Sequence, residues 1–479
     1  MRSDTVDCTE PDDGLLQTIV TQTAGCGSIL LAYSGGLDSS VLLHLLVAVR
    51  QRLGLPIRAA YIHHGLNPLA DSWAEHCRQQ CERWQVPFVS LSVTVEAQNG
   101  GIEAAARTAR YQALQAHLQD GEALLTAQHL DDQSETFLLA LKRGSGPAGL
   151  SAMAASTLLG DSTLLGDNTT LGQHRLVRPL LGISRLQLEA YAQRHQLGWI
   201  EDDSNRDERF DRNFLRRQIL PRLTQRWPHF PSAVARSAQL CAEQEQLLDE
   251  LLEESLQVLC QPDGALSIDG LIPLSPVRRF ALLRRWLAQQ GATMPAREQL
   301  QRLWDEVATS RQDAEPVLQL NQMQVRRFRQ YLYLLPLMPS LKDRIIPWPS
   351  PSCPLSLPDN LGTLALSDSG VAVRAPENGE AVSIRFSTSG TVHIVGRAHG
   401  RQIKKLWQEL NVPPWWRDRT PLVFYNEQLI AAVGRFVTRE GQAKENQPVW
   451  HIIWEKRELG KRKPERKSLR EKLKLADPE

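Results

Sequence analysis

The heptapeptide Ser34–Ser40, which reads Ser-Gly-Gly-Leu-Asp-Ser-Ser, constrains the fold of this chain more than any other stretch. The apolar run before it, residues 29–33, has the length of a buried strand. The apolar run after it, residues 41–53, is long enough to favour a helix. The order is therefore strand, glycine turn and helix, with N-cap residue types at the start of the helix.

A turn of this composition suits a phosphate group. Two adjacent glycines permit positive φ and let the backbone approach a ligand closely. The N–H groups of the first helical turn and the positive end of the helix dipole attract an anion. The spacing is neither that of the Walker loop nor that of the dinucleotide fingerprint. A turn that merely joins strand to helix is the alternative, but the context favours phosphate binding by Ser34, Gly35, Gly36, Leu37, Asp38 and Ser39.

Polar chemistry gathers again at a second strand end. A predicted strand at residues 124–127 leads into a helix that begins near His129. His129, Asp132 and Glu135 recur at a spacing of three, so they share one side of that helix. Carboxylates at a helix start also serve as ordinary caps, which is the alternative. Next to a bound nucleotide, however, such acids suit Mg²⁺, which takes one or two carboxylates together with substrate phosphates.

Three further groups carry candidate residues. His64 follows a predicted strand at residues 57–62, on the edge of a parallel sheet where ligands bind. Arg107 and Arg110 share a helix face, which is either a solvated basic surface or a contact for phosphate or carboxylate. An acidic loop at residues 201–208 precedes a helix whose polar residues are denser than packing needs, namely Arg212, Asn213 and Arg216.

The chain of 479 residues suggests roughly three domains. The first third alternates strands with helices, which predicts an α/β domain with a parallel sheet. Residues from about 230 to 310 show helical periodicity, and the last domain reads as a small α+β fold. The predicted divisions are 1–225 for the α/β domain, 226–336 for a helical domain, 337–376 for a linker rich in Pro and Ser, 377–455 for the α+β domain and 456–479 for a basic tail.

Basic and aromatic residues in the last domain point to RNA. Lys404, Lys405 and Arg417 are interleaved with tryptophans, and RNA bases stack on aromatic rings while phosphates attract cations. The alternative is that the tryptophans fill a small core. The tail from Lys456 to Lys474 carries ten Lys/Arg against three Glu. Such a run is either a disordered, solvated segment or a source of sequence-independent attraction for phosphates.

Several classes of protein are disfavoured. No apolar run reaches the ~18 residues of a membrane span. The seven cysteines are scattered and form no Cys-x-x-Cys, which argues for a reducing cytoplasm and against a disulfide framework or a zinc site. We therefore expect a cytoplasmic protein.

Ser-Gly-Gly-x-Asp-Ser after an apolar strand resembles the PP-loop of the ATP pyrophosphatases, which cleave ATP between its α and β phosphates. Within that group, nearly the whole chain resembles the family of tRNA(Ile)-lysidine synthases of the longer bacterial type. The likeness rests on Ser34–Ser40, His63–Leu66, Ala106-Arg107 with Arg110-Tyr111, His129–Thr136 with Arg143-Gly144, Arg178–Leu181, Asp203–Asn205 with Arg212-Asn213, Gly400–Lys405 and Pro413–Trp415. The departures are a tandem repeat at 158–172 and the basic tail, and neither touches a motif.

The resemblance implies that residues 1–225 form a PP-loop catalytic domain and that the two later domains bind tRNA. It implies ATP and Mg²⁺ as cofactors, and free L-lysine and the CAU-anticodon isoleucine tRNA as substrates. The wobble cytidine would be adenylated at O2, and the lysine ε-amine would then displace AMP from C2 to give lysidine. A homodimer is compatible with this interpretation.

The resemblance also suggests roles for individual residues. Asp38 and Asp132 are expected to surround the metal and the lysine, with Glu135 close by, and Arg212 is expected to stabilise the adenylate or the RNA backbone. These four form the predicted catalytic set. The predicted neighbourhood of substrate and adenylate consists of His64, Arg107, Arg110, His129, Asn213 and Arg216. Lys404, Lys405 and Arg417 are the predicted tRNA contacts.

Two other classes of function stay open at this point, namely another PP-loop enzyme and a tRNA-binding protein without catalysis. A PP-loop tRNA thiolase would want cysteines in its motifs, and none lies there. An amidotransferase-fed synthetase would need a glutaminase domain, for which the chain has no room. A tRNA-binding protein with a vestigial nucleotide site belongs to a different class. The intact loop and the acids Asp131, Asp132 and Glu135 argue against it.

Overall fold

The computed structural model describes residues 10–65, 67–95, 102–159, 174–202, 207–311 and 314–456. Residues 160–172 of the tandem repeat, the Asp203–Asn205 motif and the tail after Lys456 lie outside the described residues. The chain divides into two compact units, Met1–Gln301 and Arg302–Glu479. None of the helices in the described ranges is both long and apolar enough to span a membrane.

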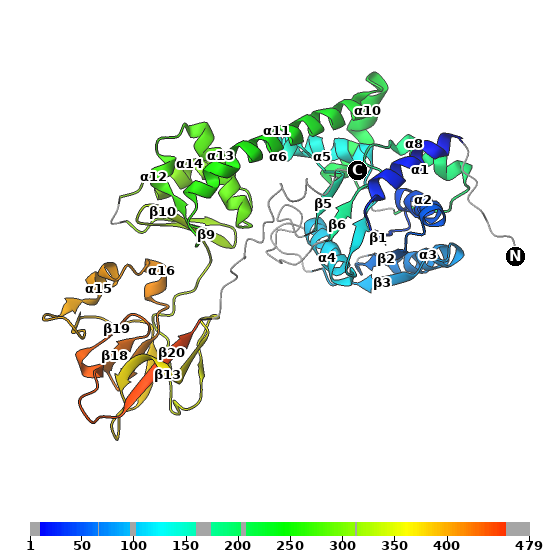
Figure 1. The fold of residues 1–479 in the computed structure, drawn as a ribbon. Helices are drawn as coiled ribbons and strands as arrows, with labels where there is room; N and C mark the ends of the chain where they lie inside the picture. Colours follow the sequence, from blue (N-terminus) through cyan, green and yellow to red (C-terminus); the bar gives the residue numbers. More distant parts are fainter. Residues whose placement is uncertain are drawn as a thin grey trace, which may run out of the picture. The chain divides into compact units, whose positions relative to one another are not determined.

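The first unit is built on a six-stranded sheet in the order β3-β2-β1-β4-β6-β5 (Figure 1). Five strands are parallel and the edge strand β5 is antiparallel to β6. The chain leaves β1 toward β2 on one side and later returns to β4 on the other, so the strand order reverses at β1. The strands are β1 Ser28–Ala32, β2 Ile57–His63, β3 Phe88–Ser92, β4 Glu122–Leu125, β5 Ser156–Leu158 and β6 Arg175–Val177. The predicted parallel α/β sheet is confirmed.

The central strand β1 is buried on both faces of the sheet because its middle residues are apolar. Ile29 and Leu31 of β1 pack into one core, and Leu30 between them packs into the other. The first core lies under the helices α1 (Glu10–Thr23), α2 (Leu37–Leu53), α3 (Ala70–Arg83) and α8 (Arg185–Arg194), and the second lies under α4 (Ile102–His117). This two-sided covering is what a continuous apolar strand demands.

A buried polar cluster ties α2 to α8. His44 of α2 is only 4% exposed, and its Nδ1 lies 2.8 Å from the hydroxyl of Tyr191 of α8. Its ring also packs on the rings of Trp84 and His195, and His195 Nε2 lies 2.9 Å from Oδ2 of buried Asp12. The pKa of His44 is lowered to about 4, mainly by burial and then by the nearby His195, with Asp12 acting in the opposite direction.

This cluster predicts a loss of stability in mild acid. An unfolded histidine has a pKa near 6.5, so the unfolded chain binds a proton that the folded His44 refuses. The contribution is complete above about pH 6.5 and is lost as the pH falls toward 4. Between pH 7 and 5 the free energy of unfolding should fall by about 2 kcal/mol from this residue alone. Urea unfolding of the wild type and His44→Gln at both pH values measures it. The fall should be smaller in the variant by that amount, and equal falls would contradict the assignment.

A helical region completes the first unit. It begins with the short helices α9 (Asp211–Phe214) and α10 (Leu220–Arg226), joined by the π-helical turn η2 (Leu215–Ile219). The 30-residue helix α11 (Phe230–Leu259) then packs on α5 (Leu130–Lys142) and α6 (Pro147–Leu150) of the sheet domain (Figure 1). It continues into β7 (Leu266–Ser267), α12 (Ile268–Leu271), α13 (Pro276–Gln289) and α14 (Arg297–Arg302). The predicted helical region is thus anchored on the α/β domain through α11.

Near its start the second unit contains three strands, although the sequence predicted a helical domain there. After the π-helical η3 (Leu303–Ala308) come β8 (Val317–Leu320), β9 (Met323–Phe328) and β10 (Tyr331–Pro336). β9 pairs antiparallel with both β8 and β10. Burial alternates along β8, where Leu318 and Leu320 are buried, and along most of β10. Residues 226–336 are therefore not helical throughout.

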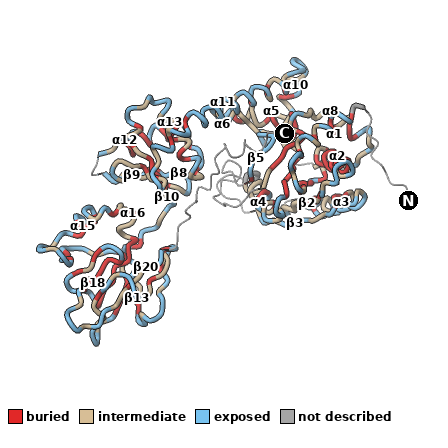
Figure 2. The backbone as a smooth tube through the Cα atoms, in the orientation of Figure 1, coloured by how far each residue is buried: buried red, intermediate tan, exposed pale blue. Residues whose placement is uncertain are grey.

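The C-terminal part is a mixed fold dominated by strands. One sheet has the order β11-β14-β17-β18-β19 and another the order β12-β13-β20, with a small β15-β16 pair. Figure 2 shows that buried residues concentrate on the strands, and all of β17 is buried. The elements are β11 Ile345–Pro347, β12 Leu355–Ser356, β13 Thr363–Arg374, β14 Val382–Arg385, β15 Thr391–Val392, β16 Arg401–Gln402, α15 Ile403–Glu409, α16 Pro414–Arg417, β17 Leu422–Tyr425, β18 Gln428–Ala432, β19 Phe436–Val437, η4 Arg439–Gly441 and β20 Val449–Glu455.

The stretch 337–376, predicted as a linker, is instead part of this fold. It supplies β11, β12 and β13, and the side chains of Trp348 and Leu364 lie in the same core as Ile384 and Val423. Proline and serine here mark short strands and turns. Whether such a stretch joins the fold depends on the burial of its apolar side chains, which local composition does not reveal.

Candidate active site

Glycine is required at the centre of the loop that follows β1. Gly35 has φ +78°, a conformation that other residues rarely adopt. A Cβ at this position would lie 2.6 Å from Ile200 Cδ1 and 2.8 Å from Cys77 Sγ. Gly36 is the N-cap of α2. The loop is therefore pressed against α3 and the segment after α8.

The serines of the loop are already ordered. Ser39 Oγ donates to the Gly36 carbonyl at 3.0 Å and lies 3.1 Å from Ser34 Oγ. Ser40 is 7% exposed and donates to the Gly35 carbonyl at 3.3 Å. The first N–H groups of α2 have no partner within the helix, because a helix leaves those donors unsatisfied. An anion placed above Gly36 would meet these N–H groups and the positive end of the helix dipole.

The second polar segment lies beside the loop because β4 pairs with β1. His129 caps α5: Asp131 N donates to its Nδ1 at 3.2 Å, and its own N donates to Asp132 Oδ2 at 3.0 Å. The other ring nitrogen, Nε2, lies 3.7 Å from Asp38 Oδ2 and 3.5 Å from Asp132 Oδ2. His129 is thus both a cap and the bridge between the two predicted acids.

Two arginines from the α9–η2 segment contact the acids of α5. Arg216 Nε lies 2.6 Å from Glu135 Oε1, and Arg216 Nη2 lies 2.8 Å from Asp132 Oδ1. Arg212 Nε lies 3.5 Å from Glu135 Oε2, and its Nη2 donates to Thr136 Oγ1 at 3.3 Å. Glu135 is fully buried. The predicted residues Asp38, His129, Asp132, Glu135, Arg212 and Arg216 therefore form one connected network.

Burial sets the proton affinities in this network. It raises the pKa of Asp38, against the opposing charges of His129 and Arg185. It also raises the pKa of Glu135, against the pull of Arg216. Burial alone would lower the pKa of His129, but the surrounding carboxylates outweigh it and the pKa is raised. Carboxylates with raised pKa values take up protons more readily near neutral pH, as a general base must.

The remaining predicted residues lie apart from that network or support it indirectly. Burial, Arg110 and His63 together lower the pKa of His64 to about 4, so His64 is neutral and close to Arg110. Arg107 lies over the ring of Tyr111 at 5.1 Å. Asn213 Nδ2 donates to the Asp207 carbonyl at 2.9 Å and so helps to fix the start of α9.

Two arginines close to the predicted residues were not among the site residues predicted from the sequence. Arg185 Nη1 lies 3.0 Å from Asp38 Oδ2, and its backbone N donates to Asp131 Oδ2 at 2.8 Å. Arg178 is 2% exposed, and burial followed by Arg107 lowers its pKa. The signal for Arg178 was its place in the Arg-Pro-Leu-Leu motif directly after β6. Nothing local marks Arg185, whose role depends on α8 returning to the loop.

The acids of the network fit a magnesium ion bound together with phosphates. Asp38 and Asp132 offer oxygen donors toward the same imidazole, and oxygen is the ligand atom that Mg²⁺ prefers. Within the ranges that the structure describes, no group of three or more His, Cys, Asp or Glu side chains is arranged to hold a metal. Any metal here would therefore complete its coordination with substrate oxygens and water.

In the second unit the predicted RNA-binding residues differ in availability. Lys404 and Lys405 are exposed on α15. Arg417 is half-buried, and its Nη1 lies 3.3 Å from Glu315 Oε1. Trp407 and Trp415 are buried, so for these two the core-filling alternative is confirmed.

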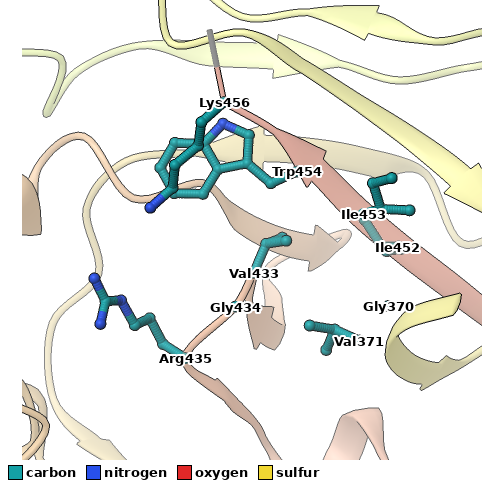
Figure 3. Close-up of a pocket in the computed structure, with 9 residues that line it drawn as sticks. All are labelled: Gly370, Val371, Val433, Gly434, Arg435, Ile452, Ile453, Trp454 and Lys456. Carbon is teal, nitrogen blue, oxygen red and sulfur yellow. The ribbon is translucent and has the colours of Figure 1, made fainter. Parts of the chain in front are cut away.

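A pocket of about 400 Å³ lies at the end of β20 (Figure 3). Lys456 Nζ lies 4.4 Å from the ring centre of Trp454 and 5.8 Å from that of Trp416. Burial and the nearby Arg435, which also lines the pocket, lower the pKa of Lys456. The pocket thus presents two cations and an indole face.

Comparisons with known proteins agree with these features. Three family models match: "PP-loop domain" over residues 13–223, "TilS substrate binding domain" over 266–333 and "TilS substrate C-terminal domain" over 382–454. The tRNA(Ile)-lysidine synthase of Pectobacterium atrosepticum is 87% identical, over 94% of this chain and 100% of its own. That of Serratia proteamaculans is 62% identical, over 90% and 96%. Among solved structures, the U34-tRNA thiolase NcsA from Methanococcus maripaludis aligns with TM-score 0.40 at 14% identity, over 48% of this chain and 79% of that one.

Proposed function

The chain belongs to the family of tRNA(Ile)-lysidine synthases, ATP-using ligases that form C–N bonds, and we propose that it joins lysine to C2 of the wobble cytidine in the isoleucine tRNA with a CAU anticodon. The modified base, lysidine, pairs with A instead of G. The change also converts the aminoacylation identity of the tRNA from methionine to isoleucine. The observation that carries the proposal is the network joining the phosphate loop to Asp132, Glu135 and their arginines.

In the first step, O2 of the cytidine attacks the α phosphorus of ATP and pyrophosphate leaves. The loop from Ser34 to Ser39 holds the departing phosphates through N–H groups and hydroxyls. Arg212 and Arg216, which lie in the network with Asp132 and Glu135, are proposed to supply the counter-charge for the reacting phosphate. Placing fixed cations there lowers the barrier because they need no reorganisation during reaction.

In the second step, the lysine Nε attacks C2 and AMP leaves with the former O2. The attacking amine must be neutral, so its ammonium form has to lose a proton first. Asp38 and Asp132 are proposed to hold the ammonium, with Asp38 receiving the proton. We assign Asp38 and Asp132 to this dual environment of lysine and Mg²⁺. The ion, when bound, neutralises phosphate charge.

The second unit is proposed to bind the tRNA. Lys404 and Lys405 are exposed cations on one helix, and Arg435 with Lys456 and Trp454 adds a further surface of cations and an aromatic ring. Such surfaces attract RNA phosphates and stack with bases.

Removing the two lysines should weaken tRNA binding uniformly. In Lys404→Ala/Lys405→Ala, the slope of log affinity against log salt should become shallower by about 1 to 2, because each lost phosphate contact removes about one unit. Arg417→Ala is the comparison, since Arg417 already pairs with Glu315 and should change the slope less. Filter binding of the tRNA at several salt concentrations measures both. Equal slopes in the wild type and the double variant would exclude these lysines as phosphate contacts.

The proposal as a whole is tested with ATP, labelled lysine and tRNA. Label should enter the RNA only when the wobble base is C. A binding protein without activity would consume no ATP. A sulfur-transferring enzyme would need a reactive cysteine, whereas Cys77 beside the loop is buried and its pKa is raised by that burial. Absence of label with a CAU tRNA would overturn the proposal.

A further inference from the structure

Arg185 stands between two carboxylates. Its Nη1 lies 3.0 Å from Asp38 Oδ2, and its Nε lies 2.9 Å from Oε1 of Glu189, one turn further along α8. The guanidinium is therefore shared between Asp38, which follows the phosphate loop, and Glu189, which lies on the same helix as Arg185. Its side chain is 40% exposed, so it has room to move.

The backbone at this point is held independently of the side chain. Arg185 N donates to Asp131 Oδ2, and Ser184 forms a capping box with Gln187 at the start of α8. A change at the guanidinium therefore leaves the helix in place. Only the pairing of Asp38 depends on where the Arg185 side chain points.

We propose that Arg185 is a positioning residue that competes with the divalent cation for Asp38, and that Glu189 retains the guanidinium when Asp38 turns to the metal and nucleotide. This rests on the proposed function, because it assumes that Asp38 is a ligand of a metal bound with ATP. The physical basis is that a carboxylate oxygen that coordinates a divalent cation cannot at the same time keep a full ion pair with a guanidinium at 3.0 Å. While no metal is bound, Arg185 balances the charge of Asp38 and so reduces its repulsion with Asp132. Arg185 thereby sets the metal concentration at which the site fills.

The two partners of Arg185 give variants with opposite expected effects. Arg185→Met removes the competitor, so the metal should bind more tightly. Glu189→Gln removes the alternative partner, so Arg185 stays on Asp38 and the metal should bind more weakly. Each change should be about two- to five-fold, because a partly exposed ion pair contributes modestly. Arg185→Lys keeps the charge and should stay within two-fold of the wild type.

Direct binding tests this without catalysis. Mn²⁺ binding to the full chain is followed by electron paramagnetic resonance in the presence of ATP whose α,β-bridging oxygen is replaced by methylene. Circular dichroism confirms folding of each variant. Opposite shifts for Arg185→Met and Glu189→Gln support the inference, and unchanged or parallel shifts overturn it. If the wild type binds no Mn²⁺ with the analogue, the metal assignment fails and the inference fails with it. If the wild type binds and the folded variants match it, only the role of Arg185 is lost.

Discussion

Replacing Asp38 by Ala should slow pyrophosphate release by about 10² to 10⁴, the range expected when a group central to proton transfer or charge stabilisation is lost. Asp38 is where the loop, His129 and Arg185 meet. Its removal leaves two cations facing the site without their acid. Asp132→Ala should have a similar effect, because Asp132 contacts both His129 and Arg216.

Pyrophosphate release and lysidine formation are measured together for these variants in a single turnover. Asp71→Ala serves as the control, since the Asp71 side chain is 97% exposed and pairs only weakly with His63 from the same domain. The control should react at the wild-type rate. Near-normal rates in Asp38→Ala or Asp132→Ala would remove that residue from the mechanism.

The second large effect is on stability. Glu135 is fully buried and pairs with Arg216 at 2.6 Å and with Arg212 at 3.5 Å. Breaking a fully buried ion pair from one side costs about 3–5 kcal/mol. Because Arg216 is 35% exposed and keeps Asp132 at 2.8 Å, the cost of losing Glu135 should be smaller, about 2–3 kcal/mol. Since whole domains are stable by only about 5–15 kcal/mol, Glu135→Ala should unfold at much lower urea concentration than the wild type.

A double variant separates the pair's structural role from its chemical role. In Glu135→Leu/Arg216→Met both charges are replaced by apolar groups, so stability should recover in part. It should stay below the wild-type value, because Arg212 and Asp132 each lose a partner. Lysidine formation should stay lost, because Arg216 no longer supplies a counter-charge and no longer holds Asp132. A loss below about 1 kcal/mol in Glu135→Ala would show that the pair is not the buried anchor described here.

Local patterns predicted the parts of the fold that they control. The strand–turn–helix order around Gly35, and the spacing of His129, Asp132 and Glu135, follow from short-range rules, and the pairing of β1 with β4 brings them together. Residues that directly follow neighbouring parallel strands lie close together at the carboxyl edge of the sheet. This is why these residues could be placed in one neighbourhood from the sequence.

Features that depend on distant contacts were missed. Arg185 reaches Asp38 only because α8 packs on α2 near the buried His44 and Tyr191. β8 and β10 alternate buried residues with more exposed ones, as half-buried strands do, but they follow a long helical pattern that the sequence-based prediction extended too far. Residues 337–376 were read by composition, whereas burial of Trp348 and Leu364 in a shared core determines their structure.

The most direct test of the central claim is to trap the activated tRNA. With ATP labelled at the α phosphate and no lysine, label should accumulate on the CAU tRNA as AMP linked through the wobble cytidine. Adding lysine should then release all of the label as AMP while lysidine appears in equal amount. If no label reaches the RNA, or if added lysine leaves it there, the two-step chemistry assigned to this site is wrong.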